Sequence, residues 1–141
     1  MSQEIYNKIV LKLEKLDKYL GYLSELQQVN KEVFTADYHF FGLAERYFQL
    51  SIEVMLDVGK MLLLSEKTRR PEDNSDIFYA LSEAGVISRD FVDRISGVVN
   101  FRNILVHEYE DIDKEIIYTK LQKNLEDFTE FKRQVIKYLS K

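Results

Sequence analysis

The chain has 141 residues, of which 45% are hydrophobic and 31% are charged, and it contains no cysteine. This length fits one compact domain spanning residues 1–141, and the lack of cysteine excludes disulfides and thiolate chemistry. The net charge of −4 argues against a surface that coats nucleic acid non-specifically, because such surfaces carry an excess of lysine and arginine. The charged N-terminus resembles no targeting signal and no apolar run is long enough to cross a membrane, so we expect a cytoplasmic protein.

Apolar residues recur at three- and four-residue steps along most of the chain, and the single proline lies in a charged stretch at residues 66–76. This pattern predicts long helices with few breaks. The expected helices run from Ser2 to about Val29, from Thr35 or Asp37 to about Ser65, from Asp76 to Ala84, from Ser88 past Val106, and from Asp111 or Asp113 to Leu139. No stretch alternates with period two, as a half-buried strand would. The prediction is an all-α fold, an up-and-down four-helix bundle with an additional short helix.

Several kinds of site have no counterpart in the sequence. It contains no glycine-rich phosphate loop, no GxSxG elbow and no dinucleotide fingerprint. Two separated histidines without cysteine do not make a zinc site of the usual kind, so we expect neither a metal nor a cofactor. Glu53 and Asp57, four residues apart, share a helix face, and such a pair is far more often solvated than catalytic. His39, near an expected helix start, is typical of a partly packed residue.

The stretch RNILVHEYED, residues 102–111, gathers polar side chains at the end of an expected helix. With about 100° per residue, Asn103 and His107 fall on one line of that helix, and Arg102 and Tyr109 on a neighbouring line. Histidine exchanges protons near neutral pH, and arginine offers a permanently charged fork to a phosphate. Cleavage of RNA through its own 2′-hydroxyl needs these two capacities and no metal. The helix dipole also favours arginine and histidine near a helix C-terminus, so spacing alone leaves a structural role open.

The residues Arg102, His107 and Tyr109 form the pattern RxxxxHxY, which resembles the motif of the HEPN superfamily and specifically its HepT-like branch. Asn103 supplies the polar residue that follows the arginine in that motif. The stretch GLAERYFQLSIEVMLDVGKMLL, residues 42–63, is similar to the second helix of the family. The order of long helices, charged loop, short helix, motif helix and final helix also matches from end to end.

The resemblance implies a homodimer in which the motifs of both protomers meet in a cleft at the interface. It further implies a metal-independent endoribonuclease that serves as the toxin of a toxin–antitoxin pair. The antitoxin would be a minimal nucleotidyltransferase of the MntA type, which transfers AMP to the motif tyrosine and silences the toxin. The resemblance assigns roles to six residues: Arg102 and His107 as catalytic, Asn103, Glu53 and Asp57 as supporting, and Tyr109 as the AMPylation acceptor.

Two other functions are compatible with the same residues. The first is a non-catalytic helical dimer that binds a nucleotide or RNA and docks to a nucleotidyltransferase. The second is a plain dimerisation protein in which Arg102 and His107 make structural hydrogen bonds. Turnover of RNA distinguishes a nuclease from the first alternative. If His107→Ala mainly lowers the melting temperature, the second alternative is indicated.

Overall fold

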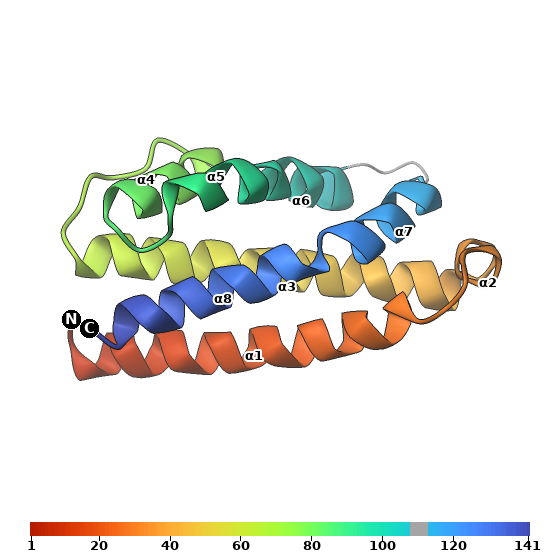
Figure 1. Ribbon diagram of the computed structural model, residues 1–141, viewed down its shortest axis with the longest axis horizontal. Coiled ribbons are helices and arrows are strands. Elements are labelled where there is room, and N and C mark those ends of the chain that lie inside the picture. The colour runs from red at the N-terminus through yellow and green to blue at the C-terminus, as the bar shows by residue number, and fades with distance from the viewer. Residues whose placement is uncertain (108–112) are drawn as a thin grey trace.

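The computed structural model describes residues 1–107 and 113–141, and all regular structure in these ranges is helical (Figure 1). The helices are α1 (Gln3–Gln27), α2 (Lys31–Ala36), α3 (Tyr38–Ser65), η1 (Asn74–Asp76, a 3-10 turn), α4 (Ile77–Glu83), α5 (Arg89–Ile95), α6 (Gly97–His107), α7 (Lys114–Lys123) and α8 (Leu125–Leu139). The prediction of an all-α fold is confirmed.

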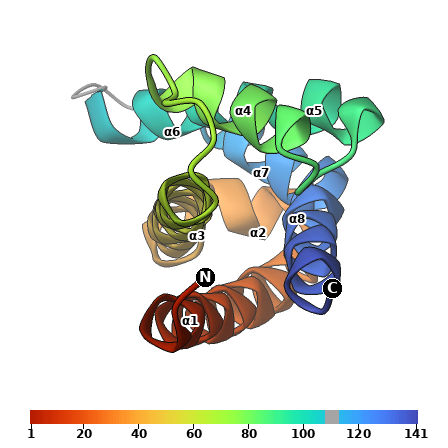
Figure 2. The ribbon, with the colours of Figure 1, turned by 90° about the vertical axis from the view of Figure 1, so that its left-hand side faces the viewer.

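The helices form four arms that run alternately in opposite directions (Figures 1 and 2). The first arm is α1 and the second is α3, which packs along α1. The helices α4, α5 and α6 follow one another as the third arm, and α7 and α8 form the fourth. Figure 2 shows α3 and α8 on opposite sides of the bundle, with α1 below and the third arm above. Among the described residues, no helix covers the outer side of α3 or of α6 beside it (Figure 2).

Helix starts follow the polar residues that the sequence indicated. Ser2, Asp37, Ser88 and Asp113 each accept a hydrogen bond from a backbone N–H in the first turn of α1, α3, α5 and α7, respectively. Such caps satisfy N–H groups that have no partner inside the helix. Asp111, the other residue at which the last helix was expected to start, lies outside the described residues.

The apolar stripes of the arms meet in one core. In α1 the buried positions recur at three- and four-residue steps: Ile9, Leu13, Leu16, Leu20, Leu23 and Leu26. Phenylalanines from different arms pack edge to face at the centre, including Phe48 against Phe128 and Phe78 against Phe131. Burial of such apolar surface contributes roughly 25 cal/mol per Å², so this shared core holds the arms together.

Two helices that the sequence predicted as continuous are divided. The helix expected from Ser88 past Val106 breaks at Ser96, where α5 ends and α6 begins anew at Gly97. The final helix breaks at Asn124, whose φ of −116° departs from helical geometry. The sequence prediction missed the breaks because both residues interrupt an apolar periodicity that continues on either side.

The short helix α2 was not predicted. Asn30 caps it by accepting a hydrogen bond from the N–H of Val33 at 2.9 Å. Phe34 is its one buried residue and packs against Tyr118 of α7 with the ring centroids 5.3 Å apart. A helix of six residues is too short to show a periodic apolar pattern, and this tertiary contact stabilises it.

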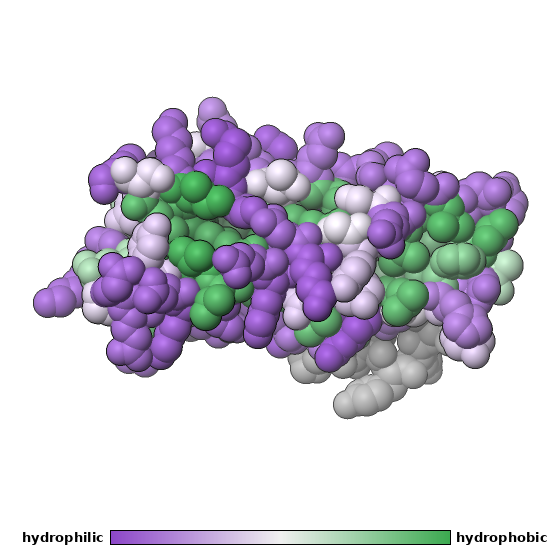
Figure 3. Space-filling view, turned by 90° about the horizontal axis from the view of Figure 1, so that it is seen from below, coloured by the Kyte–Doolittle hydropathy of each residue, from purple (hydrophilic) through white to green (hydrophobic). Residues whose placement is uncertain are grey.

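Hydrophilic and hydrophobic residues both contribute to the surface of the described part of the chain (Figure 3). Among these residues, no helix combines the length and the apolar character that a membrane span needs. Seen from the α1 side, the molecule is largely hydrophilic, with hydrophobic residues gathered in separate patches (Figure 3).

Candidate functional site

The motif helix α6 is anchored by the apolar residues between its polar ones. Phe101 and Leu105 are 6% exposed each and belong to the core. The ring of Phe101 meets that of Phe48 on α3 edge to face at 5.3 Å, and Lys120 of α7 lies over its other side at 5.8 Å. Because these contacts fix the rotation of α6 about its own axis, they also decide where the polar residues of the motif face.

Arg102 faces α3. Its side chain is 23% exposed, and its Nη2 lies 3.5 Å from Oε1 of Glu53. The Nε atom is buried without a hydrogen-bond partner among the described atoms. Glu53 Oε1 also accepts a hydrogen bond of 3.3 Å from the side-chain amide of Gln49, one turn earlier on α3. A half-buried guanidinium with one carboxylate on one edge keeps N–H donors available to an anion with two or more oxygens, such as a phosphate.

The other residues proposed for the site have different surroundings. Asn103 is exposed, so it faces solvent and not α3. Asp57 lies one turn beyond Glu53, but its carboxylate forms an ion pair of 3.3 Å with Lys12 of α1 and is 50% exposed. The structure therefore brings Glu53 to Arg102 and directs Asp57 to a different cation.

The far end of the motif is only partly described. His107 is the last residue of α6, and its side chain lies outside the described part of the structure. Tyr109 lies within residues 108–112, outside the described residues. Their roles as catalytic residue and AMPylation acceptor therefore stay predictions.

The other histidine, His39, is 69% exposed at the start of α3 and contacts Asp37 at 2.8 Å. Hydrogen bonds from His39 lower the pKa of Asp37.

Two residues near the site were not singled out from the sequence. Gln49 supports Glu53 from the preceding turn, a spacing of four that a search for paired polar residues could have found. Lys12 engages Asp57 from another helix, and no local pattern signals that contact. Two turns before Glu53 on α3, partial burial raises the pKa of Glu45 above its usual value.

Comparison with known proteins gives the family. The family described as "Ribonuclease HepT-like" matches residues 12–135, which is most of the chain. The chain belongs to the HepT-like ribonuclease family. This confirms the resemblance drawn from RxxxxHxY and the expected class of enzyme, an endoribonuclease.

Two curated relatives are named as nucleases. The tRNA nuclease HepT of Aphanizomenon flos-aquae is 24% identical over 131 residues, covering 93% of this chain and 89% of the relative. The mRNA nuclease HepT of Shewanella oneidensis is 28% identical over 83 residues, covering 59% of this chain and 62% of the relative.

Solved structures share the fold. A tri-AMPylated HEPN toxin of Shewanella oneidensis, in complex with its MNT antitoxin, superposes with a TM-score of 0.80 at 24% identity, covering 98% of this chain and 99% of that chain. A toxin–antitoxin structure with AMP-PNP has a TM-score of 0.82 at 22% identity, covering 92% of this chain and 97% of that one. At these identities the likeness concerns the fold.

Proposed function

We propose that this protein is a metal-independent endoribonuclease toxin. Its homodimer would cut RNA in a cleft at the interface, with Arg102 and His107 as catalytic residues and Asn103 as a supporting one. The observation that carries the proposal is the ion pair of half-buried Arg102 on α6 with Glu53 on α3, which leaves further Nη donors of the guanidinium for a phosphate. No described helix covers the outer sides of these two helices (Figure 2). Membership of the HepT-like ribonuclease family supports the reaction class.

The chemistry follows from the two side chains. A neutral histidine removes the proton of a ribose 2′-hydroxyl, and the freed oxygen attacks the adjacent phosphorus. The bond from phosphorus to the 5′-oxygen breaks, and that oxygen takes up a proton as it leaves, so the products are a 2′,3′-cyclic phosphate and a 5′-hydroxyl end. Arginine stabilises the negative charge that builds on the phosphorane oxygens. Neither role requires a metal ion.

The dimer is supported by apolar residues around the site. Leu43 is 47% exposed on α3 and Ile104 is 42% exposed on α6, and Leu50 continues the line of Leu43 along α3. Leu43 and Leu50 share α3 with Glu53, and no described helix covers the outer side of α3 (Figure 2). A two-fold axis through this face would bring two copies of Arg102 into one cleft and concentrate positive potential there.

The proposed regulation rests on relatives. A relative with this fold was solved as an AMPylated toxin bound to an MNT antitoxin. By the motif, the acceptor in this chain is Tyr109, and the partner is a minimal nucleotidyltransferase. AMP attached at that position would add a phosphodiester near Arg102, which would occupy the cation and fill the RNA cleft. The proposed location is the cytoplasm, where RNA and such a partner are both present.

The proposal is tested by cleavage of RNA in the presence of EDTA. We expect the wild type to cut, and Arg102→Ala and His107→Ala to lose at least about a hundredfold in rate, since each removes a transition-state interaction. His39→Ala is the matched control, because this other histidine is exposed and contacts Asp37. An inactive wild type, or variants that cut equally well, would contradict the proposal. RNA bound tightly without turnover would instead indicate the non-catalytic binding dimer.

Modification is tested by co-expression with a minimal nucleotidyltransferase of the MntA type. We expect the purified protein to gain one or more AMP units in mass spectrometry, mapped to the peptide that contains Tyr109. Tyr109→Phe should abolish the increment and leave the protein active when the partner is present. An increment that persists in Tyr109→Phe would assign the modification to another residue.

A further inference from the structure

A pocket lies at the C-terminal end of α3, the helix that carries Glu53, and at some distance from Arg102 on α6. It has a volume of about 550 Å³, and its charged lining consists of four cations: Lys60, Lys67, Arg69 and Arg70. None of the described residues that line it is a carboxylate, in a protein whose net charge is −4. Leu64, in the same pocket, is 79% exposed and offers an apolar surface beside the cations.

Three of these cations are available to a ligand. Arg69 is engaged, because its guanidinium donates to Asp76 at 2.5 Å and to Glu83 at 2.5 Å. Within residues 1–107 and 113–141, Lys60, Lys67 and Arg70 form no ion pair, and all three are exposed. The contacts of Arg69 also hold the loop after α3 in place, so the wall of the pocket is organised before anything binds.

The backbone at Lys67 points to a functional residue. Lys67 has a φ of 53°, in the left-handed region where glycine is favoured. The N–H of Thr68 bonds to the carbonyl of Leu63, and the N–H of Lys67 to that of Leu64, which is the pattern of a Schellman helix end. Glycine is the preferred residue at this position, so the lysine here costs stability while it contributes a charge to the pocket.

The pocket is in line with the proposed cleavage site. Lys60 is seven residues after Glu53, so it lies on the same face of α3 about 10 Å further along the axis. The acid between them, Asp57, is paired with Lys12. Lys60 therefore lies about 10 Å along α3 from the carboxylate that pairs with Arg102, a distance that a few nucleotides of RNA can span.

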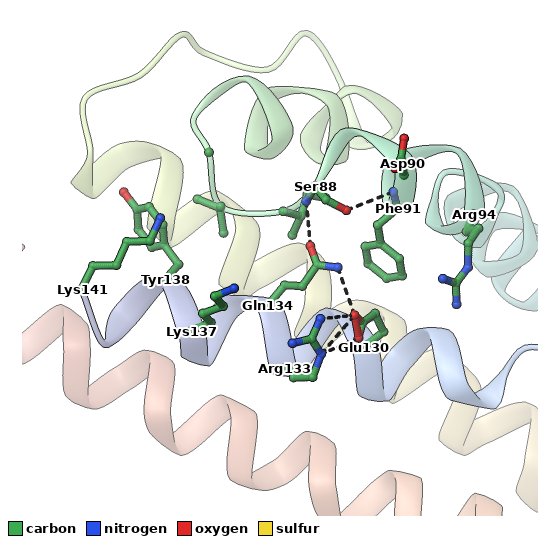
Figure 4. A pocket seen from close by; sticks show the side chains of 13 residues that line it. Ser88, Asp90, Phe91, Arg94, Glu130, Arg133, Gln134, Lys137, Tyr138 and Lys141 are labelled. Atoms are coloured by element: carbon green, nitrogen blue, oxygen red, sulfur yellow. Dashed lines mark hydrogen bonds and ion pairs between the residues drawn. The ribbon is translucent and has the colours of Figure 1, made fainter.

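The other pocket of similar size differs in its charges. It lies between α5 and α8, and Figure 4 shows Arg133 turned toward Glu130 within it. Arg133 makes several hydrogen bonds to Glu130, which lower the pKa of that carboxyl to about 2, and Arg94 pairs with Asp127 at 2.6 Å. Lys137 and Lys141 lie along its α8 edge (Figure 4). Acids thus neutralise part of this pocket, and it sits on the side of the bundle away from α3 (Figure 2).

We propose that the pocket formed by Lys60, Lys67 and Arg70 around Leu64 binds the phosphate backbone of the RNA substrate a few nucleotides from the scissile bond. The inference rests on the proposed ribonuclease function and adds a substrate-binding site to it. The cations would contact phosphates, and Leu64 would pack against a base, as apolar platforms do in proteins that bind single strands.

Binding of RNA tests the proposal. In His107→Ala protein, which prevents cutting, we would measure the anisotropy of a labelled single-stranded RNA of about twelve nucleotides over a range of salt concentrations. The double variant Lys60→Gln with Arg70→Gln should bind about tenfold more weakly at low salt. Its slope of log K against log salt should fall by about 1.4, because each lost phosphate contact removes about 0.7. The matched control, Lys137→Gln with Lys141→Gln, removes the same charge from the other pocket and should bind as before.

The variant Lys67→Gly distinguishes a role of Lys67 in RNA binding from a role in stability. Glycine relieves the left-handed backbone, so this variant should melt at a higher temperature than the parent. It should nevertheless bind the RNA more weakly, by about threefold, because it has lost one phosphate contact. A lysine that served only the helix end would give a change in melting temperature and no change in affinity, which would overturn its proposed role.

The remaining outcomes distinguish this inference from the proposed function. If the wild type cleaves RNA but both double variants bind it equally well, the pocket does not contact the substrate and only the inference fails. If Lys60→Gln with Arg70→Gln binds RNA normally but no longer retains the nucleotidyltransferase, the pocket docks a protein instead. A wild type that neither binds nor cleaves RNA contradicts the proposed function itself.

Discussion

Arg102 shows how one residue can be both fixed and available. Its side chain is 23% exposed with Nε buried, and Nη2 pairs with Glu53 of α3 at 3.5 Å. The distance is long for a strong ion pair, so the carboxylate orients the guanidinium without using all its donors. Asn103, the next residue, is exposed, so the two neighbours in the motif serve different sides of the helix.

At the scale of single residues, we predict that substitutions of Glu53 and Asp57 on α3 have unequal effects on the rate of RNA cleavage. Glu53→Gln removes the charge beside Arg102 and should lower kcat for RNA cleavage about tenfold, because a misplaced reacting group costs rate. Asp57→Asn is the matched control, and it should stay within about twofold, since Asp57 pairs with Lys12 near the surface. Single-turnover cleavage measures both. Equal losses would show that the two acids act together, as their spacing alone suggests.

At the scale of elements, α3 and α4 approach closely at one glycine. A Cβ built on Gly59 would lie 2.6 Å from Cγ2 of Ile77 and 3.2 Å from Cδ1 of Leu81, both in the buried core. Ile77 is β-branched and has little freedom to move aside. The third arm can therefore lie against α3 only while position 59 has no side chain.

Gly59→Ala should reduce stability although it raises helix propensity. We expect the free energy of unfolding to fall by about 1–2 kcal/mol, because overpacking outweighs the gain of about 1 kcal/mol that alanine brings to a helix interior. Gly21→Ala in α1 is the control: nothing lies within 4 Å of its added Cβ, so it should be neutral or stabilising. Chemical denaturation measures both. A stabilised Gly59→Ala would mean that α4 moves away at little cost.

At the scale of the whole molecule, Arg69 connects the loop after α3 to the start and end of α4. It donates to Asp76 and to Glu83, and these contacts lower the pKa of Asp76 to about 2. A carboxyl whose pKa is lower in the folded state than its ordinary value of 3.8 stabilises the fold above that value. This contribution is lost as the pH falls from about 4 toward 2.

Arg69→Gln should therefore have a pH-dependent effect. Its melting temperature should lie below that of the wild type at pH 7, and the difference should shrink as the pH falls from about 4 to 2, where the wild type also loses the interaction. Thermal melts followed by circular dichroism at several pH values measure the difference. Arg70→Gln, one residue later and exposed, is the control and should leave the melting temperature unchanged. A constant difference at every pH would assign the effect of Arg69 to packing.

The interface of the proposed dimer is also a property of the whole molecule. Leu43→Glu places a charge on the uncovered face of α3 and should give a monomer that no longer cleaves RNA, because a buried unpaired charge opposes association. Ile136→Glu changes a residue of α8 with a similar exposure, 43% against 47%, on the opposite side of the bundle, and should leave the dimer intact. Light scattering after size-exclusion chromatography measures the mass. A Leu43→Glu dimer would place the interface elsewhere.

Local patterns in the sequence determined much of this protein. Apolar periodicity predicted the arms of the bundle, and polar residues such as Ser2, Asp37 and Ser88 marked helix starts, because both depend on neighbours within a few residues. The motif RxxxxHxY likewise pointed to the family. Each of these features depends on residues that lie close together in the sequence.

The tertiary structure decided what depends on residues far apart. The pairing of Arg102 with Glu53, the engagement of Asp57 by Lys12, and the break that lets α6 begin at Gly97 arise only when helices from different parts of the chain pack together. A periodic pattern gives the buried face of each helix, but not which helix meets it or at what rotation. Packing of large side chains such as Phe101 sets that rotation, and so it decides which polar groups share a site.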